Sequence, residues 1–131
     1  MRYQGGEVEL RFFLECTLRG FAVSVPLQDT EAYDLILDIS GRLRRVQIKS
    51  TSSPVKSSSH VRYKIHADHG NDKNNRQYSP RDVDILAAYL IPLDLWYIIP
   101  VTEIQGPSLA LYPHDHLRGH YGRFANNWDI L

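Results

Sequence analysis

The stretch that most constrains the fold is YDLILDISGRLRRVQIKS, residues 33–50. Two runs with strand-like alternation flank Ser40-Gly41, where glycine can take the positive φ angle of a two-residue hairpin turn. That turn places Asp34 directly across from Gln47. The opposite face near this end carries three apolar residues, Leu35, Leu37 and Val46. Because a one-residue slip would turn all of them away from a core, the pattern predicts a hairpin in one fixed register.

Three polar side chains converge on one face of this hairpin. Side chains alternate along a strand, so Gln47 and Lys49 share a face, and the pairing puts Asp34 on it as well. Carboxylate and amide oxygens are hard ligands suited to Mg²⁺. A lysine beside them can hold or deprotonate an attacking water and offset charge that develops on phosphorus. The alternative is a surface Asp–Lys pair on an exposed sheet face, which contributes little to stability.

A helix is expected over residues 6–20, because apolar residues recur at helical spacing and Gly20 supplies a C-terminal stop. Its expected buried stripe consists of Leu10, Phe13, Leu14, Thr17 and Leu18. Glu9 would flank that stripe and reach the edge of the sheet as a further carboxylate. On spacing alone, Glu7 competes with it.

The remaining segments alternate between strands and polar loops. Strands are expected over residues 21–26 and 61–67 and on either side of Pro92-Leu93, and a short helical turn at 79–82. Loops are expected over 50–59 and 68–80, and irregular structure with a packed end near Trp128 from about Glu103 onward. This order predicts an α/β fold, a mixed β-sheet with the N-terminal helix packed on one face.

Length and composition suit one soluble domain over residues 1–131. The single cysteine, Cys16, cannot form an internal disulfide, which fits a reducing cytoplasm. The N-terminal residues are charged where a secretory signal would be apolar. The apolar region 85–101 is interrupted by two prolines and an aspartate, so two buried strands are expected there and no membrane span.

Charge is unevenly distributed, although the chain is formally neutral. The segment from Arg42 to Arg81 holds ten of the fifteen basic residues and two of the fifteen acidic ones, so it carries +8 and the remainder −8. This asymmetry indicates a loop-strand-loop arm that meets a polyanion such as double-stranded DNA, with a solvated basic face as the alternative. The candidate DNA contacts on this arm are Lys56, Arg62, Lys64, Lys73 and Arg76.

Two further groups of polar residues are candidate phosphate contacts. Ser50 and Thr51 follow Lys49 directly and can contact phosphate or simply end the strand. HDHLRGH, residues 114–120, offers histidines that zinc can bind, but without cysteines surface histidines are the preferred interpretation.

The pattern resembles the PD-(D/E)XK nuclease superfamily, since Asp34 lies thirteen residues before Gln47-x-Lys49 and a glutamate-bearing helix precedes both. More narrowly, it is similar to the endonucleases of this superfamily that are associated with group I introns. The segments that carry this likeness are GEVELRFFLECTLRGFAVSVP, YDLILDISGRLRRVQIKST, DVDILAAYL and WYIIP. Two positions depart from the superfamily pattern: Tyr33 replaces the usual proline, and Gln47 replaces the second acidic residue, as in the intron-encoded branch.

The resemblance implies a restriction-endonuclease-like core and an active site. Glu9, Asp34 and Gln47 would form the shell of a Mg²⁺ ion, with Mn²⁺ as a substitute, and Lys49 would be the catalytic lysine. Glu9 lies eleven residues before Gly20, as the glutamate of the family's helical motif does, which favours it over Glu7.

The implied function is a sequence-specific, homing-type DNA endonuclease that hydrolyses phosphodiester bonds. Because cutting both strands requires two sites, a homodimer or homotetramer is expected. The alternatives are a structure-selective nuclease, such as a Holliday junction resolvase, and a DNA-binding module of the same fold that lacks catalysis.

Overall fold

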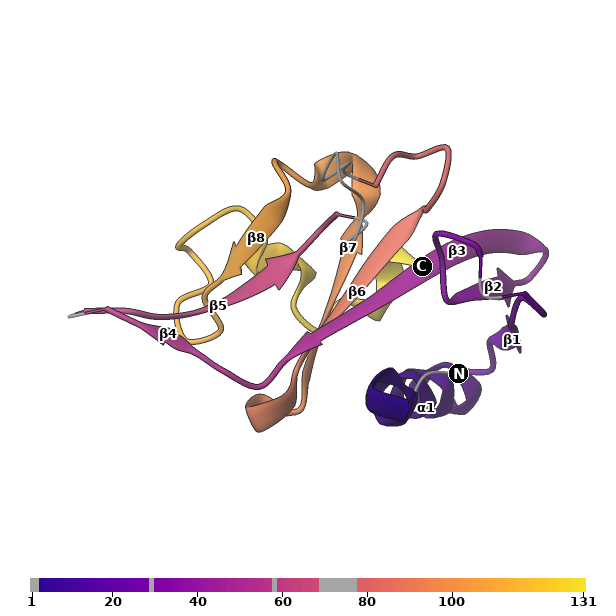
Figure 1. Cartoon of the computed structure of the whole chain (residues 1–131), viewed down its shortest axis with the longest axis horizontal. Helices are drawn as coiled ribbons and strands as arrows, with labels where there is room; N and C mark the ends of the chain where they lie inside the picture. Colours follow the sequence, from indigo (N-terminus) through magenta and orange to yellow (C-terminus); the bar gives the residue numbers. More distant parts are fainter. Residues whose placement is uncertain (1–2, 29, 58, 69–77) are drawn as a thin grey trace.

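An N-terminal helix and a mixed five-stranded sheet form one part of the structure, and a smaller sheet covers the other side (Figure 1). The structure is a computed structural model that describes residues 3–28, 30–57, 59–68 and 78–131. Helix α1 spans Tyr3–Leu18. The strands are β1 (Ala22–Ser24), β2 (Leu35–Ile39), β3 (Arg42–Thr51), β4 (Val55–Lys56), β5 (Val61–His66), β6 (Ile85–Leu90), β7 (Leu95–Pro100) and β8 (Ser108–Leu111).

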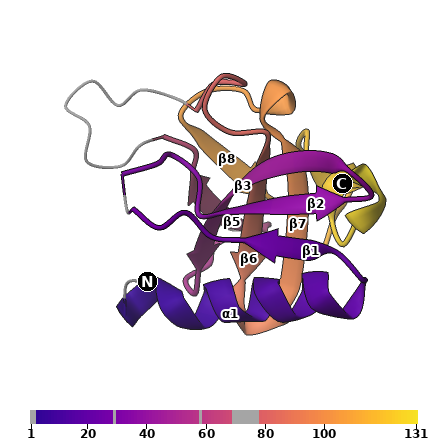
Figure 2. The same ribbon diagram turned by 90° about the vertical axis from the view of Figure 1, so that its right-hand side faces the viewer.

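The large sheet has the order β1-β2-β3-β6-β7, and the small sheet has the order β4-β5-β8. Strands β3 and β6 run parallel, whereas the other neighbouring strands pair antiparallel. Figure 2 shows α1 lying along one side of the large sheet, next to β1. The mixed α/β sheet with a packed N-terminal helix is therefore confirmed.

The β2–β3 hairpin has the expected register, because Leu35 pairs with Val46 and Ile39 with Arg42. Ser40 and Gly41 have φ angles of 53° and 88°, the positive values that a two-residue hairpin turn with two left-handed positions needs. The three apolar residues of the hairpin are buried, as expected.

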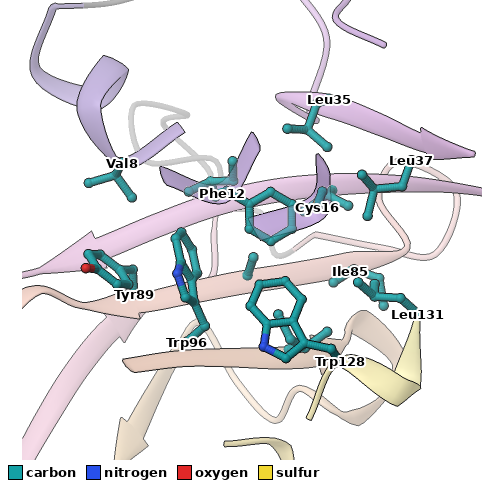
Figure 3. Close-up of a cluster of buried hydrophobic side chains, with 14 residues drawn as sticks. Val8, Phe12, Cys16, Leu35, Leu37, Ile85, Tyr89, Trp96, Trp128 and Leu131 are labelled. Atoms are coloured by element: carbon teal, nitrogen blue, oxygen red, sulfur yellow. The ribbon is translucent and has the colours of Figure 1, made fainter. Parts of the chain in front are cut away.

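The first hydrophobic core lies between α1 and the large sheet (Figure 3). Its centre is a group of aromatic side chains from three distant segments. The ring of Phe12 on α1 lies 5.1 Å from Trp96 on β7 and 5.7 Å from Trp128 near the C-terminus, measured between centroids. Offset and edge-on contacts of this kind add to the stabilisation from burial alone. The expectation of a packed end near Trp128 is thereby confirmed.

The expected buried stripe of α1 is wrong. The helix instead buries Val8, Phe12 and Cys16, which are spaced four residues apart. The stripe expected to be buried lies on the outer side, where Leu10, Phe13, Leu14 and Leu18 are exposed. Both stripes are apolar, and the aromatic partners of Phe12 decide which of them faces the sheet.

A second core joins the other face of the large sheet to the small one. Tyr63 and Ile65 of β5 and Leu109 and Leu111 of β8 pack there against residues of β6 and β7. Strand β8 lies in the tail that was expected to be irregular. Strand β4 and the end of β3 occupy part of the segment that was expected to be a loop.

The expected strand pair around Pro92-Leu93 is confirmed as β6 and β7, joined by a 3₁₀ turn at Ile91–Leu93. Every residue of β6 is buried, which explains the continuous apolar run in this part of the sequence. No helix in the described part of the chain is long and apolar enough to cross a membrane.

Candidate active site

The site is organised by Asp34, which lies where the β2–β3 ladder ends. Its backbone N–H donates to the carbonyl of Val46 at 2.8 Å, so the chain is still paired at this point. One oxygen of its carboxylate accepts a hydrogen bond from the backbone N–H of Ile48 at 2.7 Å. The carboxylate thus replaces the carbonyl that a longer β2 would have offered to β3. This bond holds the Asp34 side chain beside Gln47 and Lys49.

Gln47 and Lys49 project from β3 on the side away from α1. They pair with Leu86 and Ala88 of β6, whose side chains belong to the second core. Both are partly exposed. The amide nitrogen of Gln47 donates to the carbonyl of Ile48 at 3.4 Å, and this orientation leaves the amide oxygen as the ligand atom.

Tyr78 lies next to this group and Asp68 is close enough to Tyr78 to act on its phenol, and the sequence did not predict a role for either residue. The ammonium nitrogen of Lys49 is 5.9 Å from the ring centroid of Tyr78, which is buried. Burial, followed by the negative charges of Asp34 and Asp68, raises the pKa of the Tyr78 phenol. Asp68 is only 8% exposed. Both residues belong to the stretch 68–80, for which the sequence predicts only a polar loop.

Glu7 and Glu9 lie on opposite flanks of α1. Glu7 forms an ion pair with Arg11 at 3.0 Å on the helix surface. Glu9 is partly buried. Because α1 covers the face opposite to Gln47 and Lys49, the helix can supply a carboxylate only around the edge of β3, beyond the point where the pairing with β2 ends.

The donor set is small. Among the described residues, no three aspartate, glutamate, histidine or cysteine side chains form a group that could hold a metal ion. A carboxylate and an amide oxygen are nevertheless hard donors, and Mg²⁺ commonly takes one or two carboxylates and completes its shell with water and substrate phosphate. The chemistry of Asp34 and Gln47 therefore fits this ion.

Some of the basic residues in the positively charged segment stabilise the fold. The guanidinium of Arg45 contacts both carboxylate oxygens of Asp84, at 3.1 and 3.2 Å, and the carbonyl of Pro80 at 2.8 Å. The backbone N–H of Arg45 also donates to Asp84. Partial burial opposes ionisation of this carboxyl, but the hydrogen bonds from Arg45 outweigh it and hold the pKa of Asp84 below its ordinary value. Arg42 donates to the C-terminal carbonyl of Leu131.

Three of the expected DNA contacts are exposed on the β4–β5 hairpin. Arg62 and Lys64 project from the outer face of β5, whereas Tyr63 and Ile65 alternate with them and face the core. Lys56 pairs with Val61 and therefore lies on the other side of the hairpin. The major groove of DNA is wide enough to admit a two-stranded β-ribbon, and this hairpin carries cations on both sides. The other two expected contacts, Lys73 and Arg76, lie outside the described residues.

The remaining candidate phosphate contacts are Ser50, Thr51 and the histidines of residues 114–120. Thr51 shares the face of Lys49, and its hydroxyl accepts a hydrogen bond from the N–H of Ser53 at 3.3 Å. Ser50 is exposed on the opposite face. The histidines of residues 114–120 are exposed, and His120 lies 3.5 Å from the carboxylate of Glu103.

The mixed sheet, its N-terminal helix and the hairpin carrying Asp34, Gln47 and Lys49 together define a restriction-endonuclease-like core. Comparison with known proteins agrees with this class. The PD-(D/E)XK endonuclease family matches residues 1–128, so this chain belongs to that family.

Among solved structures, this chain is similar to the bacterial homing endonuclease I-Ssp6803I. The two share 26% sequence identity with a TM-score of 0.72, over 97% of this chain and 88% of the other. A comparison with curated protein sequences gives no significant match.

Proposed function

We propose that this chain is a magnesium-dependent, sequence-specific DNA endonuclease of the homing type that acts in the cytoplasm. The observation that carries the proposal is the position of Asp34, whose carboxylate accepts a hydrogen bond from the N–H of Ile48, the residue between Gln47 and Lys49 on β3. Family membership implies hydrolysis of phosphodiester bonds.

In this proposal Asp34 and the amide oxygen of Gln47 hold the metal. Glu9, which lies on α1, adds a carboxylate that reaches around the edge of β3. When bound, Mg²⁺ supplies Lewis-acid stabilisation of the charge on the scissile phosphate. Lys49 places a positive charge on the same face and stabilises the negative charge that develops on phosphorus. Tyr78 packs beside Lys49 and limits the directions in which its side chain can point.

DNA is held by the basic hairpin in this proposal. Arg62, Lys64 and Lys56 contact phosphates or base edges, and Thr51 lies on the side from which the scissile strand would reach Lys49. Each chain contributes one site, so cutting both strands of a duplex requires an assembly of two or four copies.

The test is cleavage of a library of supercoiled plasmids with random genomic inserts, in the presence of Mg²⁺ or EDTA. We expect Mg²⁺-dependent cuts at a recurring sequence. Equal cutting of an immobile four-way junction and no recurring sequence in the library would instead identify a structure-selective nuclease. DNA binding without any cutting would identify a non-catalytic module, which the missing negative charge at Gln47 makes the relevant alternative.

A further inference from the structure

A pocket of about 340 Å³ lies beside the candidate active site. It is lined by residues 30–33, which lead into β2, by residues 81–82, which lead into β6, and by Arg45 of β3. Because side chains alternate along a strand, Arg45 shares a face with Gln47 and Lys49. It lies on the side of Gln47 away from Lys49, at a distance of roughly 7 Å along the strand. A nucleotide adjacent to the one held at Gln47 is therefore close enough to enter this pocket.

We propose that the pocket binds the nucleotide next to the scissile phosphate, and that Arg81 contacts the phosphate group of that nucleotide. The proposal rests on the proposed function, because it needs the scissile phosphate to lie at Asp34 and Gln47. It adds a binding subsite outside the hairpin that carries the candidate catalytic residues. The volume of the pocket falls in the range of cavities that take small organic molecules, a class that includes a single nucleotide.

The Arg81 side chain is available to a phosphate. It is exposed, and it forms no ion pair with another residue in the described part of the chain. Its backbone is held in place, because the Arg45 guanidinium donates to the carbonyls of Pro80 and Arg81. The N–H of Arg81 also donates to the Ser79 hydroxyl at 3.3 Å. The charge of Arg45 is itself balanced by Asp84, so Arg81 is the guanidinium of this pocket that can form paired hydrogen bonds with phosphate oxygens.

The acidic residues in the lining favour a nucleotide over a free anion. Glu31 is exposed and forms no ion pair with another described residue, and Asp82 accepts a hydrogen bond from the Ser79 hydroxyl at 3.2 Å. Two carboxylates beside Arg81 repel free phosphate or sulfate. A nucleotide, in contrast, also brings amino groups on its base, from which a carboxylate can accept hydrogen bonds. Glu31 is the candidate acceptor, because Asp82 already has a partner.

Tyr33 forms an aromatic wall of the same pocket. It is partly buried and packs against the cluster of Tyr78, Val83 and Val101, so its ring has a fixed support. Bases of any kind can stack on an aromatic side chain. Since Tyr33 directly precedes Asp34, a nucleotide that rests on this ring has its neighbouring phosphate close to the proposed metal site.

The test uses a duplex with the cut sequence recovered from the plasmid library, in which each phosphate near the cut is replaced in turn by an uncharged methylphosphonate. Cleavage rates with Mg²⁺ are measured at subsaturating DNA for wild type, for Arg81→Gln and for Arg118→Gln. The last variant is the matched control, because Arg118 is an exposed arginine outside the pocket.

For wild type, a methylphosphonate at one phosphate next to the cut should lower the rate about tenfold. Arg81→Gln should cleave the unmodified duplex about tenfold more slowly than wild type and should lose its sensitivity at that one position. Arg118→Gln should behave as wild type. All three proteins should have the same circular dichroism spectrum, since the substituted side chains are exposed.

An Arg81→Gln variant that cleaves the unmodified duplex as fast as wild type, or that keeps the wild-type response to every methylphosphonate, would overturn the proposal and leave the proposed function intact. A wild type that cuts no plasmid in Mg²⁺ would contradict the proposed function, and the subsite with it.

A second measurement addresses the base. Duplexes with each of the four bases at the nucleotide identified in this way compete for cleavage. Wild type should prefer cytosine or adenine, whose amino groups lie in the major groove, and Glu31→Ala should reduce that preference at least about fivefold. Equal cleavage of all four duplexes by wild type, or an unchanged preference in Glu31→Ala, would overturn the assignment of Glu31 as the base contact.

Discussion

Asp34 has two tasks at the scale of the single residue. One carboxylate oxygen completes the hydrogen bonding of β3 through the Ile48 N–H. In the proposed site the same carboxylate supplies the negative charge that holds a metal. These tasks depend on different properties. A hydrogen-bond acceptor need not be charged, whereas the partner of a neutral Gln47 ligand must supply the negative charge that attracts the metal. Substitutions can therefore separate the two.

Asp34→Asn keeps an acceptor oxygen and should change the free energy of unfolding by about 1 kcal/mol or less, whereas Asp34→Ala leaves the Ile48 N–H without this partner and should cost about 1–3 kcal/mol. Both variants should lose Mg²⁺-dependent cleavage. Urea denaturation and a plasmid-cutting assay measure the two effects. Retained cleavage in Asp34→Asn would remove Asp34 from the metal site.

Gln47 can bind a metal only through a neutral oxygen. Gln47→Glu keeps an oxygen at nearly the same reach and adds a charge, so it should cleave at a lower magnesium concentration than wild type. Gln47→Leu has no ligand atom and should lose activity. The measurement is cleavage rate against magnesium concentration at one pH. A Gln47→Leu variant that titrates like wild type would show that Gln47 is not a ligand.

At the scale of elements, sequence predicts the hairpin far better than it predicts the helix face. The hairpin register is set locally, by the Ser40-Gly41 turn and by apolar residues that alternate with polar ones. Helix α1 has two apolar stripes, so periodicity alone does not decide between them. The choice depends on Phe12 meeting Trp96 and Trp128, which are far away in the sequence.

The same distinction between local and long-range pattern applies to the site. Asp34, Gln47 and Lys49 could be predicted together because one hairpin places them. Tyr78 could not, because it reaches Lys49 only through the packing of the segment before β6, and it carries no spacing pattern that links it to β3.

The Arg45–Asp84 ion pair joins β3 to the residue directly before β6. Its contribution to the free energy of unfolding should depend on pH. Asp84→Asn should cost about 2 kcal/mol at pH 7, typical of hydrogen bonds to a charged group. The folded pKa of Asp84 is below the unfolded value of about 3.9, so the stabilisation is present above that pH and lost as pH falls below it. Denaturation curves from pH 7 to pH 2.5 should show wild type and variant converging. A difference that stays constant over this range would contradict the role of the charge.

At the scale of the whole molecule, the exposed basic side chains of the β4–β5 hairpin are the proposed DNA contacts, and their contribution should appear in the salt dependence of binding. Replacing Lys56, Arg62 and Lys64 by glutamine should reduce the magnitude of the slope of log K against log salt by about 2–3. The reason is that three phosphate contacts are lost, so fewer counterions are released when DNA binds. The control is Arg118→Gln with Arg123→Gln, whose side chains already pair with Asp115 and Glu103. An unchanged slope in the triple variant would show that these three side chains are solvated and do not contact DNA phosphates.

In the proposed function, the active site for DNA hydrolysis lies on the face of the large sheet that bears Lys49. The most direct test measures duplex binding and Mg²⁺-dependent cleavage in parallel for wild type, Lys49→Ala and Lys64→Ala. Removing a charge that stabilises the transition state should lower the cleavage rate of Lys49→Ala by at least about a hundredfold, with DNA affinity nearly unchanged. Lys64→Ala should cleave at close to the wild-type rate once the DNA is saturating. A Lys49→Ala variant that cleaves as wild type does would contradict the assignment of this face as the active site.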